Sequence, residues 1–166
     1  MTQEFTHRNL PQLFLRAREE LLRHFRPILT HHGLTEQQWR ILRTLSEHGQ
    51  LEPREICEIC QILSPSMSGL LSRMEDLGLV TRTRMEEDQR RMWVRPTDKS
   101  VALVAAIAPL IEQQYQLLEQ AYGKTLINEM YAAMDRFFSA QRQPVASVVL
   151  PGRRRSRAAT RPSGGV

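Results

Sequence analysis

Residues 64–97 read SPSMSGLLSRMEDLGLVTRTRMEEDQRRMWVRPT, and their pattern predicts a helix followed by a hairpin. In the first half, apolar residues recur at spacings of three and four, which places them in one helical stripe: Met67, Leu70, Leu71, Met74 and Leu77. Ser64 is expected to cap this helix, Pro65 suits its first position, and Gly78 can close it in a left-handed turn. Two β-like runs then flank a polar turn, which is typical of a β-hairpin.

The outward face of this helix carries small residues where an ordinary solvated face would carry Lys, Glu and Gln. Small hydroxyl side chains and a glycine allow a large partner to approach closely, and hydroxyls can bond phosphates or base edges. We therefore predict a DNA-reading helix. Its expected contacts are Ser64, Ser66, Ser68, Gly69, Ser72 and Arg73. A simpler alternative is an amphipathic helix with a surface hairpin.

Arginines recur along both β-like runs, 79–84 and 91–95, on either side of the turn at 85–90. Guanidinium groups neutralise DNA phosphates, and such contacts add affinity without reading sequence. We expect this role for four arginines of the hairpin: Arg82, Arg84, Arg91 and Arg95. For some of them, the alternative partner is a nearby carboxylate, Glu86 or Glu87.

The net charge of +5 comes from the end of the chain. Residues 144–166 contain five arginines and no acidic residue, so the 23 Lys and Arg residues fall to 18 without them and match the 18 Asp and Glu residues. Any DNA affinity of the remaining chain must therefore come from local clustering of charge. The Arg-rich tail is predicted to be disordered, and it either adds non-specific attraction to phosphates or simply solubilises the chain.

Two helices are predicted before this stretch. A long amphipathic helix covers residues 10–28, and Pro27 is expected to kink or end it near Arg26. Thr35 to Gln38 have capping-box spacing, which opens a second helix.

Three further helices complete the pattern. A short helix at residues 53–61 is expected to turn Ile56 and Ile59 inward, and a tight turn then leads into the DNA-reading helix. Thr97 can cap a long helix that Gly123 breaks, and a last helix follows. These C-terminal helices carry more apolar surface than a small domain covers, so we expect them to form a dimerisation module with the first helix.

Together these elements predict a mainly α fold, namely a winged helix-turn-helix with a two-stranded β wing and long N- and C-terminal dimerisation helices. We expect four segments along the chain: an N-terminal dimerisation helix at 1–33, a winged helix-turn-helix DNA-binding domain at 34–97, C-terminal dimerisation helices at 98–143, and a disordered Arg-rich tail at 144–166.

Membrane association and export are not expected. The longest apolar run, residues 101–111, contains Pro109 and falls short of the roughly 20 residues that a spanning helix needs. The N-terminus has no basic region followed by an apolar stretch, which argues against a secretory signal. Two cysteines fit a reduced compartment, so we expect a cytoplasmic protein.

Several motifs in this order resemble the MarR family of bacterial transcriptional regulators over roughly residues 8–140. They are LTEQQWRIL at 34–42, the helix at 64–80, and the wing signature Asp88-Gln-Arg90-Arg91 leading to Thr97. The longer run FRPILTHHGLTEQQWRILRTL, together with DQRR, is similar to regulators of homoprotocatechuate (hydroxyphenylacetate) catabolic operons.

The resemblance implies a homodimeric repressor on a pseudo-palindromic operator of double-stranded DNA. Recognition helices would enter successive major grooves, and wings would reach the flanking minor grooves. Arg90 matches the family arginine that enters the minor groove. Asp88 is placed to orient that guanidinium, because a carboxylate at a DNA surface would otherwise be repulsive.

A small aromatic carboxylate is the expected effector. Arg18 falls within the apolar stripe of the first helix beside Phe14, and a lone buried guanidinium is costly unless an anion pairs with it. Arg43 lies one turn from Trp39, so a guanidinium fork and an aromatic ring adjoin on the second helix. The resemblance implies a small phenolic acid near these helices. Alternatively, Arg18 pairs with Glu19 of the partner subunit and Trp39 is ordinary core.

The sequence also bears on redox sensing, metal binding and catalysis. Cys57 and Cys60 form a lone CxxC, which keeps open a redox- or metal-responsive regulator; the simpler reading is that Cys60 packs as a small apolar residue. The histidines do not converge at metal-ligand spacing, so we expect no metal and no cofactor. There is no Gly-rich phosphate loop and no nucleophile elbow, so we expect no enzyme. A weakly specific DNA binder driven by the Arg-rich tail is the remaining alternative.

Overall fold

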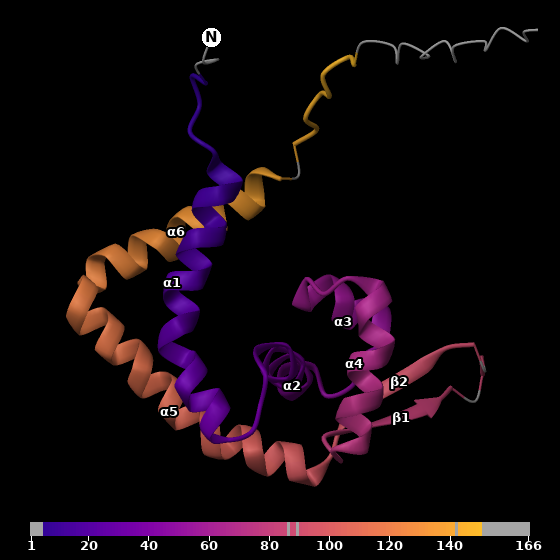
Figure 1. Ribbon diagram of the computed structural model, residues 1–166. Coiled ribbons are helices and arrows are strands. Elements are labelled where there is room, and N and C mark those ends of the chain that lie inside the picture. The colour runs from indigo at the N-terminus through magenta and orange to yellow at the C-terminus, as the bar shows by residue number, and fades with distance from the viewer. Residues whose placement is uncertain (1–4, 86, 89, 142, 151–166) are drawn as a thin grey trace, which may run out of the picture. The chain divides into compact units, whose positions relative to one another are not determined.

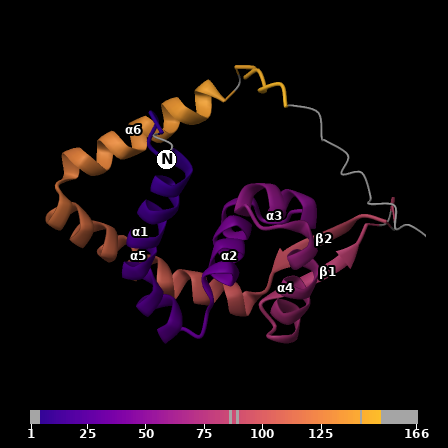
Figure 2. The same cartoon turned by 45° about the horizontal axis from the view of Figure 1, so that its top comes forward.

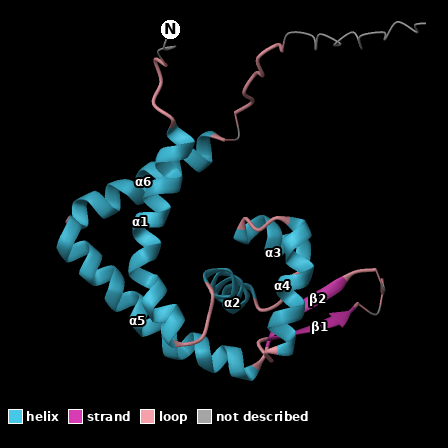
Figure 3. Cartoon of the chain, in the orientation of Figure 1, coloured by secondary structure: helices cyan, strands magenta, loops and turns pink. Residues whose placement is uncertain are grey.

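The computed structural model describes residues 5–85, 87–88, 90–141 and 143–150. The elements in these residues are α1 (Leu10–His31), α2 (Glu36–His48), α3 (Pro53–Cys60), α4 (Ser64–Asp76), β1 (Val80–Arg84), β2 (Met92–Pro96), α5 (Asp98–Tyr122) and α6 (Lys124–Ala140) (Figures 1 and 3). This is the mainly helical winged fold that the sequence predicts. Contacts divide the chain into two units, Met1–Lys124 and Thr125–Val166.

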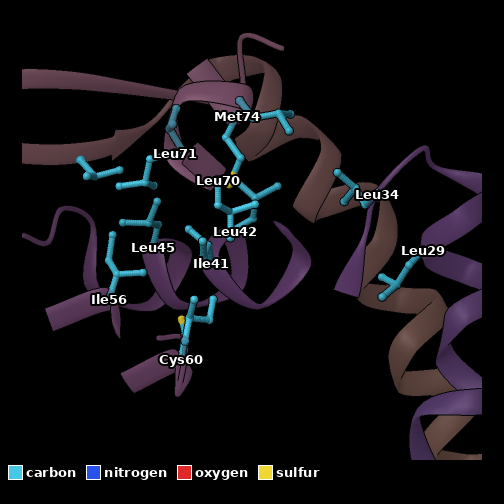
Figure 4. Close-up of a cluster of buried hydrophobic side chains, with 14 of the residues drawn as sticks. Leu29, Leu34, Ile41, Leu42, Leu45, Ile56, Cys60, Leu70, Leu71 and Met74 are labelled. Atoms are coloured by element: carbon cyan, nitrogen blue, oxygen red, sulfur yellow. The ribbon is translucent and has the colours of Figure 1, made fainter. Parts of the chain in front are cut away.

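In the first unit, α2 lies in the middle, with α3 and α4 on one side and α1 and α5 on the other (Figures 1 and 2). The core side chains around α2 come from five helices. Those labelled in Figure 4 include Leu29 of α1, Ile41, Leu42 and Leu45 of α2, Ile56 and Cys60 of α3, and Leu70, Leu71 and Met74 of α4. Helix α5 adds Ile107 and Ile111 to the same core. The apolar stripe predicted for α4 is therefore its buried face.

The wing is an antiparallel hairpin whose register pairs Arg82 with Val94 and Thr83 with Trp93. Val94 is buried and also exchanges both backbone hydrogen bonds with Leu51, at 2.9 and 3.2 Å. This bridge attaches the wing to the connection between α2 and α3.

Two of the predicted helix starts have the expected caps. Thr35 and Gln38 form a complete capping box, with hydrogen bonds of 3.2 and 2.8 Å. Thr97 caps α5 through Ser100 and also donates its hydroxyl to the carbonyl of Gly78 at 2.7 Å. Gly78 has φ +66°, so it closes α4 in the left-handed turn that the sequence predicts.

Two expectations about helix ends are wrong. The N-cap of α4 is Leu63, whose backbone is extended, and Ser64 is already the first helical residue, so the helix starts one residue earlier than expected. Pro27 does not end α1 near Arg26, because the helix continues to His31 with Pro27 inside it. The other expected effect, a kink at Pro27, stays a prediction. A proline inside a helix removes one backbone hydrogen bond and crowds the carbonyl four residues earlier, but burial of Phe25 and Leu29 on either side holds the helix together.

Two apolar residues that the sequence pattern places on buried helix faces are exposed in the structure. Ile59 is 48% exposed, because α3 contributes Ile56 and Cys60 to the core instead. Leu77 is also exposed, since it lies at the C-cap of α4, where the chain turns toward Gly78.

Helix α5 corrects the expectation about membrane-spanning segments. By length and composition alone it could cross a membrane, which the count of uninterrupted apolar residues missed. Its Ile107, Ile111 and Leu118 are buried in the core of the first unit, and Tyr115 packs on Phe25 of α1 with ring centroids 4.8 Å apart. Core helices pass the same test, so it is weak evidence for a membrane span.

A matched pair of substitutions in α3 tests this core. Ile56→Ala should lower the free energy of unfolding by about 2–5 kcal/mol, because Ile56 is fully buried and truncation leaves a cavity. Ile59→Ala, in the same helix, should change it by less than about 1 kcal/mol. Urea unfolding at one protein concentration measures both, and equal losses would contradict the assignment of α3 faces.

Candidate DNA-binding surface and ligand pocket

Helix α4 presents the predicted small residues to the outside. Ser64, Ser66, Ser68, Gly69 and Arg73 are exposed, and Ser72 is half-buried. A Cβ added at Gly69 would lie 3.5 Å from Nη1 of Arg73, which is an ordinary contact. The packing of the chain itself therefore does not require a glycine here, and the open backbone suits the close approach of another molecule.

A hollow of about 440 Å³ lies between α3, α4 and the wing. Five of the predicted DNA contacts line it: Ser64, Ser68, Arg82, Arg90 and Arg91. The other predicted residues of α4 lie on its exposed face outside this hollow. Arg84 instead lines a second hollow of about 650 Å³, together with Thr83 and Trp93 of the wing.

Arg54 is a cation at this surface that the sequence analysis missed. It lies on α3, lines the 440 Å³ hollow and forms an ion pair with Glu58 one turn away, at 3.0 Å. No spacing in the sequence marks it, because only the packing of α3 beside α4 and the wing brings it there.

Arg82 and Arg91, two of the predicted phosphate contacts, pair with carboxylates. Both Nε and Nη2 of Arg82 donate to Oε2 of Glu75, at 2.8 and 2.5 Å. Arg91 donates from Nε to both oxygens of Glu52, at 3.1 and 3.2 Å. The sequence pattern leaves Glu86 and Glu87 as alternative partners; Glu86 lies outside the described residues.

Arg95, the fourth of these arginines, donates from Nε to Oε1 of Gln50 at 2.5 Å. Its side chain is thus held at the connection between α2 and α3.

Asp88 acts on Arg90 through the main chain. Its Oδ1 accepts a hydrogen bond from the backbone N–H of Arg90 at 2.9 Å, and its carbonyl accepts one from the N–H of Arg91 at 2.9 Å. These bonds shape the turn that carries the exposed Arg90 side chain. That Asp88 also orients the guanidinium of Arg90 stays a prediction.

The four residues predicted to bind an effector fall into two groups within one chain. Trp39 and Arg43 line a hollow of about 140 Å³ between α2 and α5, beside Val104 and Ile111. Nε of Arg43 lies 3.3 Å from Glu47. Phe14 and Arg18 belong to the N-terminal half of α1 and do not line this hollow.

The side chain of Arg18 is 46% exposed, although the sequence pattern places it in an apolar stripe. In the part of the chain that the structure describes, Phe25 and Leu29 are the buried residues of α1, and both lie in its second half. Arg18 pairs with Glu36 of its own chain, whereas the sequence analysis considered Glu19 of the partner subunit.

Glu36 is the centre of a cluster that links three helices. Besides Arg18, it accepts a hydrogen bond from Nη2 of Arg40 at 2.9 Å and lies 3.8 Å from Nη2 of Arg26. Nη1 of Arg40 donates to the carbonyl of Cys60 at 2.5 Å, at the end of α3. This cluster therefore connects α1 to the turn that precedes α4. The sequence spacing indicates only the contact between Glu36 and Arg40, which lie four residues apart on α2.

The cysteines are placed as structural residues. Cys60 is buried with its sulfur 3.4 Å from Oγ1 of Thr44, as expected for a small core residue. Burial, and then the neighbouring Cys60, raise the pKa of the Cys57 thiol. A reactive cysteine needs the opposite shift, because the thiolate is the nucleophile. Among the described residues, no group of three His, Cys, Asp or Glu side chains is placed to hold a metal ion.

Comparison with known proteins identifies the family. The MarR family model matches residues 32–91. The chain is 36% identical to the HTH-type transcriptional regulator FarR of Neisseria gonorrhoeae, over 75% of this chain and 85% of that protein. It is 35% identical to the homoprotocatechuate degradative operon repressor of Escherichia coli, over 80% of this chain and 90% of that protein.

A solved structure agrees with these relatives. The crystal structure of NadR in complex with 4-hydroxyphenylacetate superposes with a TM-score of 0.71 at 32% identity, covering 82% of this chain and 97% of that one. The shared winged helix and the sequence identities lead to one conclusion. This chain belongs to the MarR family of DNA-binding transcriptional repressors, which is a family of regulators and not of enzymes.

Proposed function

We propose that this repressor is a cytoplasmic homodimer that controls an aromatic-acid catabolic operon and leaves its operator when a small phenolic acid binds. The observation that carries the proposal is the hollow between α2 and α5, where the indole of Trp39 and the guanidinium of Arg43 adjoin. A guanidinium fork matches a carboxylate, and an indole face suits an aromatic ring.

Two relatives point to the same ligand class. One is named for a homoprotocatechuate degradative operon, and another was crystallised with 4-hydroxyphenylacetate. The effector of this chain is therefore proposed to be a hydroxyphenylacetate or its catechol derivative.

Dimerisation would use the apolar residues that the single chain leaves exposed. On α1 these are Leu10, Phe14 and Leu15, and on α6 they include Phe137 and Phe138. Such exposed apolar surface is typical of a subunit interface. Phe14 and Arg18 lie on the part of α1 that the dimer would cover, so their contribution to the effector site depends on that dimer.

On DNA, α4 would enter the major groove with its serine-rich face. Two-fold symmetry would place the second α4 about one helical turn away, roughly 34–36 Å. Arg90 at the tip of the wing would enter the flanking minor groove, where A·T-rich sequence concentrates negative potential.

The Glu36 cluster offers a route from effector to DNA. An effector carboxylate bound by Arg18 would lie beside the carboxylate of Glu36 and repel it, and Glu36 also holds Arg40. Because Arg40 anchors the carbonyl of Cys60 just before α4, a change at Glu36 would alter the position of α4. A coupling of about 1–3 kcal/mol would suffice for release.

Arg90→Ala tests the wing. We expect operator affinity to fall about fivefold or more, because the minor-groove contact is lost while the dimer stays intact. Arg23→Ala is the matched control, since Arg23 lies on α1 and pairs with Glu20. Gel shifts at fixed salt measure both variants. Unchanged affinity of Arg90→Ala would contradict the role of the wing tip.

Arg43→Ala and Arg18→Ala test the effector site. Both should bind operator DNA normally but need about tenfold or more ligand for release, because each removes a proposed partner of a carboxylate. The assay titrates 4-hydroxyphenylacetate, homoprotocatechuate, salicylate and a peroxide against the repressor–DNA complex. Normal release of both variants by the phenolic acids would place the effector site elsewhere.

Two rival signals are separated by the same assay. Release by peroxide alone, lost on replacing Cys57 and Cys60 by serine, would indicate redox sensing. Loss of all DNA binding on removal of residues 144–166 would indicate that the Arg-rich tail dominates affinity. Under our proposal, operator-specific binding survives both changes.

A further inference from the structure

The wing is attached to the helical core by two carboxylates that lie outside it. Glu75, in the last turn of α4, holds Arg82 on β1. Glu52, the N-cap of α3, holds Arg91, the residue just before β2. One ion pair therefore anchors each side of the hairpin, and both arginines line the hollow where DNA is expected.

The contact at Glu75 restrains both main chain and side chain. Oε2 accepts from Nε and Nη2 of Arg82, while Oε1 accepts from the backbone N–H of Arg82 at 3.2 Å. The carboxylate thus fixes the path of β1 as well as the guanidinium. The hydrogen bonds from Arg82 lower the pKa of Glu75, and those from Arg91 lower the pKa of Glu52, so both carboxylates are charged at neutral pH.

Stability alone does not account for two carboxylates at a DNA surface. Each repels phosphates, and partly exposed ion pairs contribute little to folding. A role in holding the wing at a fixed position would explain why both carboxylates are present at this surface. Major-groove and minor-groove contacts require α4 and the wing tip to be held at one relative position, because grooves lie at fixed spacing along the duplex.

We propose that Glu75 and Glu52 are positioning residues that set the angle between the wing and α4. Arg82 and Arg91 then act on operator recognition through this geometry and not as direct phosphate contacts. The proposal rests only on DNA binding by the family fold, so it is independent of the aromatic effector.

The two roles predict opposite signs for one substitution. Glu75→Gln keeps the shape of the side chain and removes its charge. If Arg82 is a phosphate contact, freeing it from Glu75 should tighten binding and steepen the salt dependence of affinity. If Glu75 positions the wing, operator affinity should fall about fivefold or more, while non-specific DNA affinity stays unchanged or rises slightly and the salt slope stays the same. Glu52→Gln should behave in the same way through Arg91.

Asp76→Asn is the matched control. It removes the same charge one residue away on α4, where the side chain is exposed, and should leave operator affinity unchanged or slightly raised. Fluorescence anisotropy with operator and scrambled duplexes over a series of salt concentrations measures all variants. Thermal melting confirms that each variant folds.

A charge reversal completes the test and stays informative if one carboxylate variant folds poorly. Arg82→Glu should weaken operator binding, and adding Glu75→Arg should restore part of the loss by re-forming the pair with opposite polarity. No recovery in the double variant, or tighter operator binding by Glu75→Gln, would overturn the positioning role.

Discussion

The buried stripe of α4 is the constraint on which the DNA-binding surface depends. Met67, Leu70, Leu71 and Met74 are all buried against the core around α2, so α4 cannot rotate about its axis without exposing them. Their burial therefore fixes the serine-rich face toward the outside. Close packing in such cores makes the orientation discrete, which a DNA-reading element requires.

Several of the arginines at this surface are held in ion pairs with carboxylates of the same chain. The described chain holds Arg82, Arg91 and Arg54 in ion pairs, while Arg90 projects from a turn shaped by Asp88. Neutralised arginines add little long-range attraction to phosphates, but they hold the wing in place. The proposed DNA-binding surface would thus depend on geometry for specificity, and the balanced charge of residues 1–143 agrees with that.

Helices α2 and α5 form the second candidate site, the hollow proposed to bind the effector. Trp39 and Arg43 adjoin at the α2–α5 contact, and α2 also packs on α3, which leads into α4. One helix therefore contacts both the proposed effector site and the DNA-reading unit. Movement of α2 is a short physical route between them, because packed helices shift as units.

The sequence by itself determined those structural features that depend only on residues close together in the chain. The capping box at Thr35, the left-handed turn at Gly78 and the stripe of α4 all follow from spacings of a few residues. Only the tertiary structure decided the partners of Arg82 and Arg18, because Glu75 and Glu36 reach them through packing of separate elements. An ion pair between two separate elements produces no periodic pattern in the sequence, whereas burial of one helix face produces apolar residues at regular spacing.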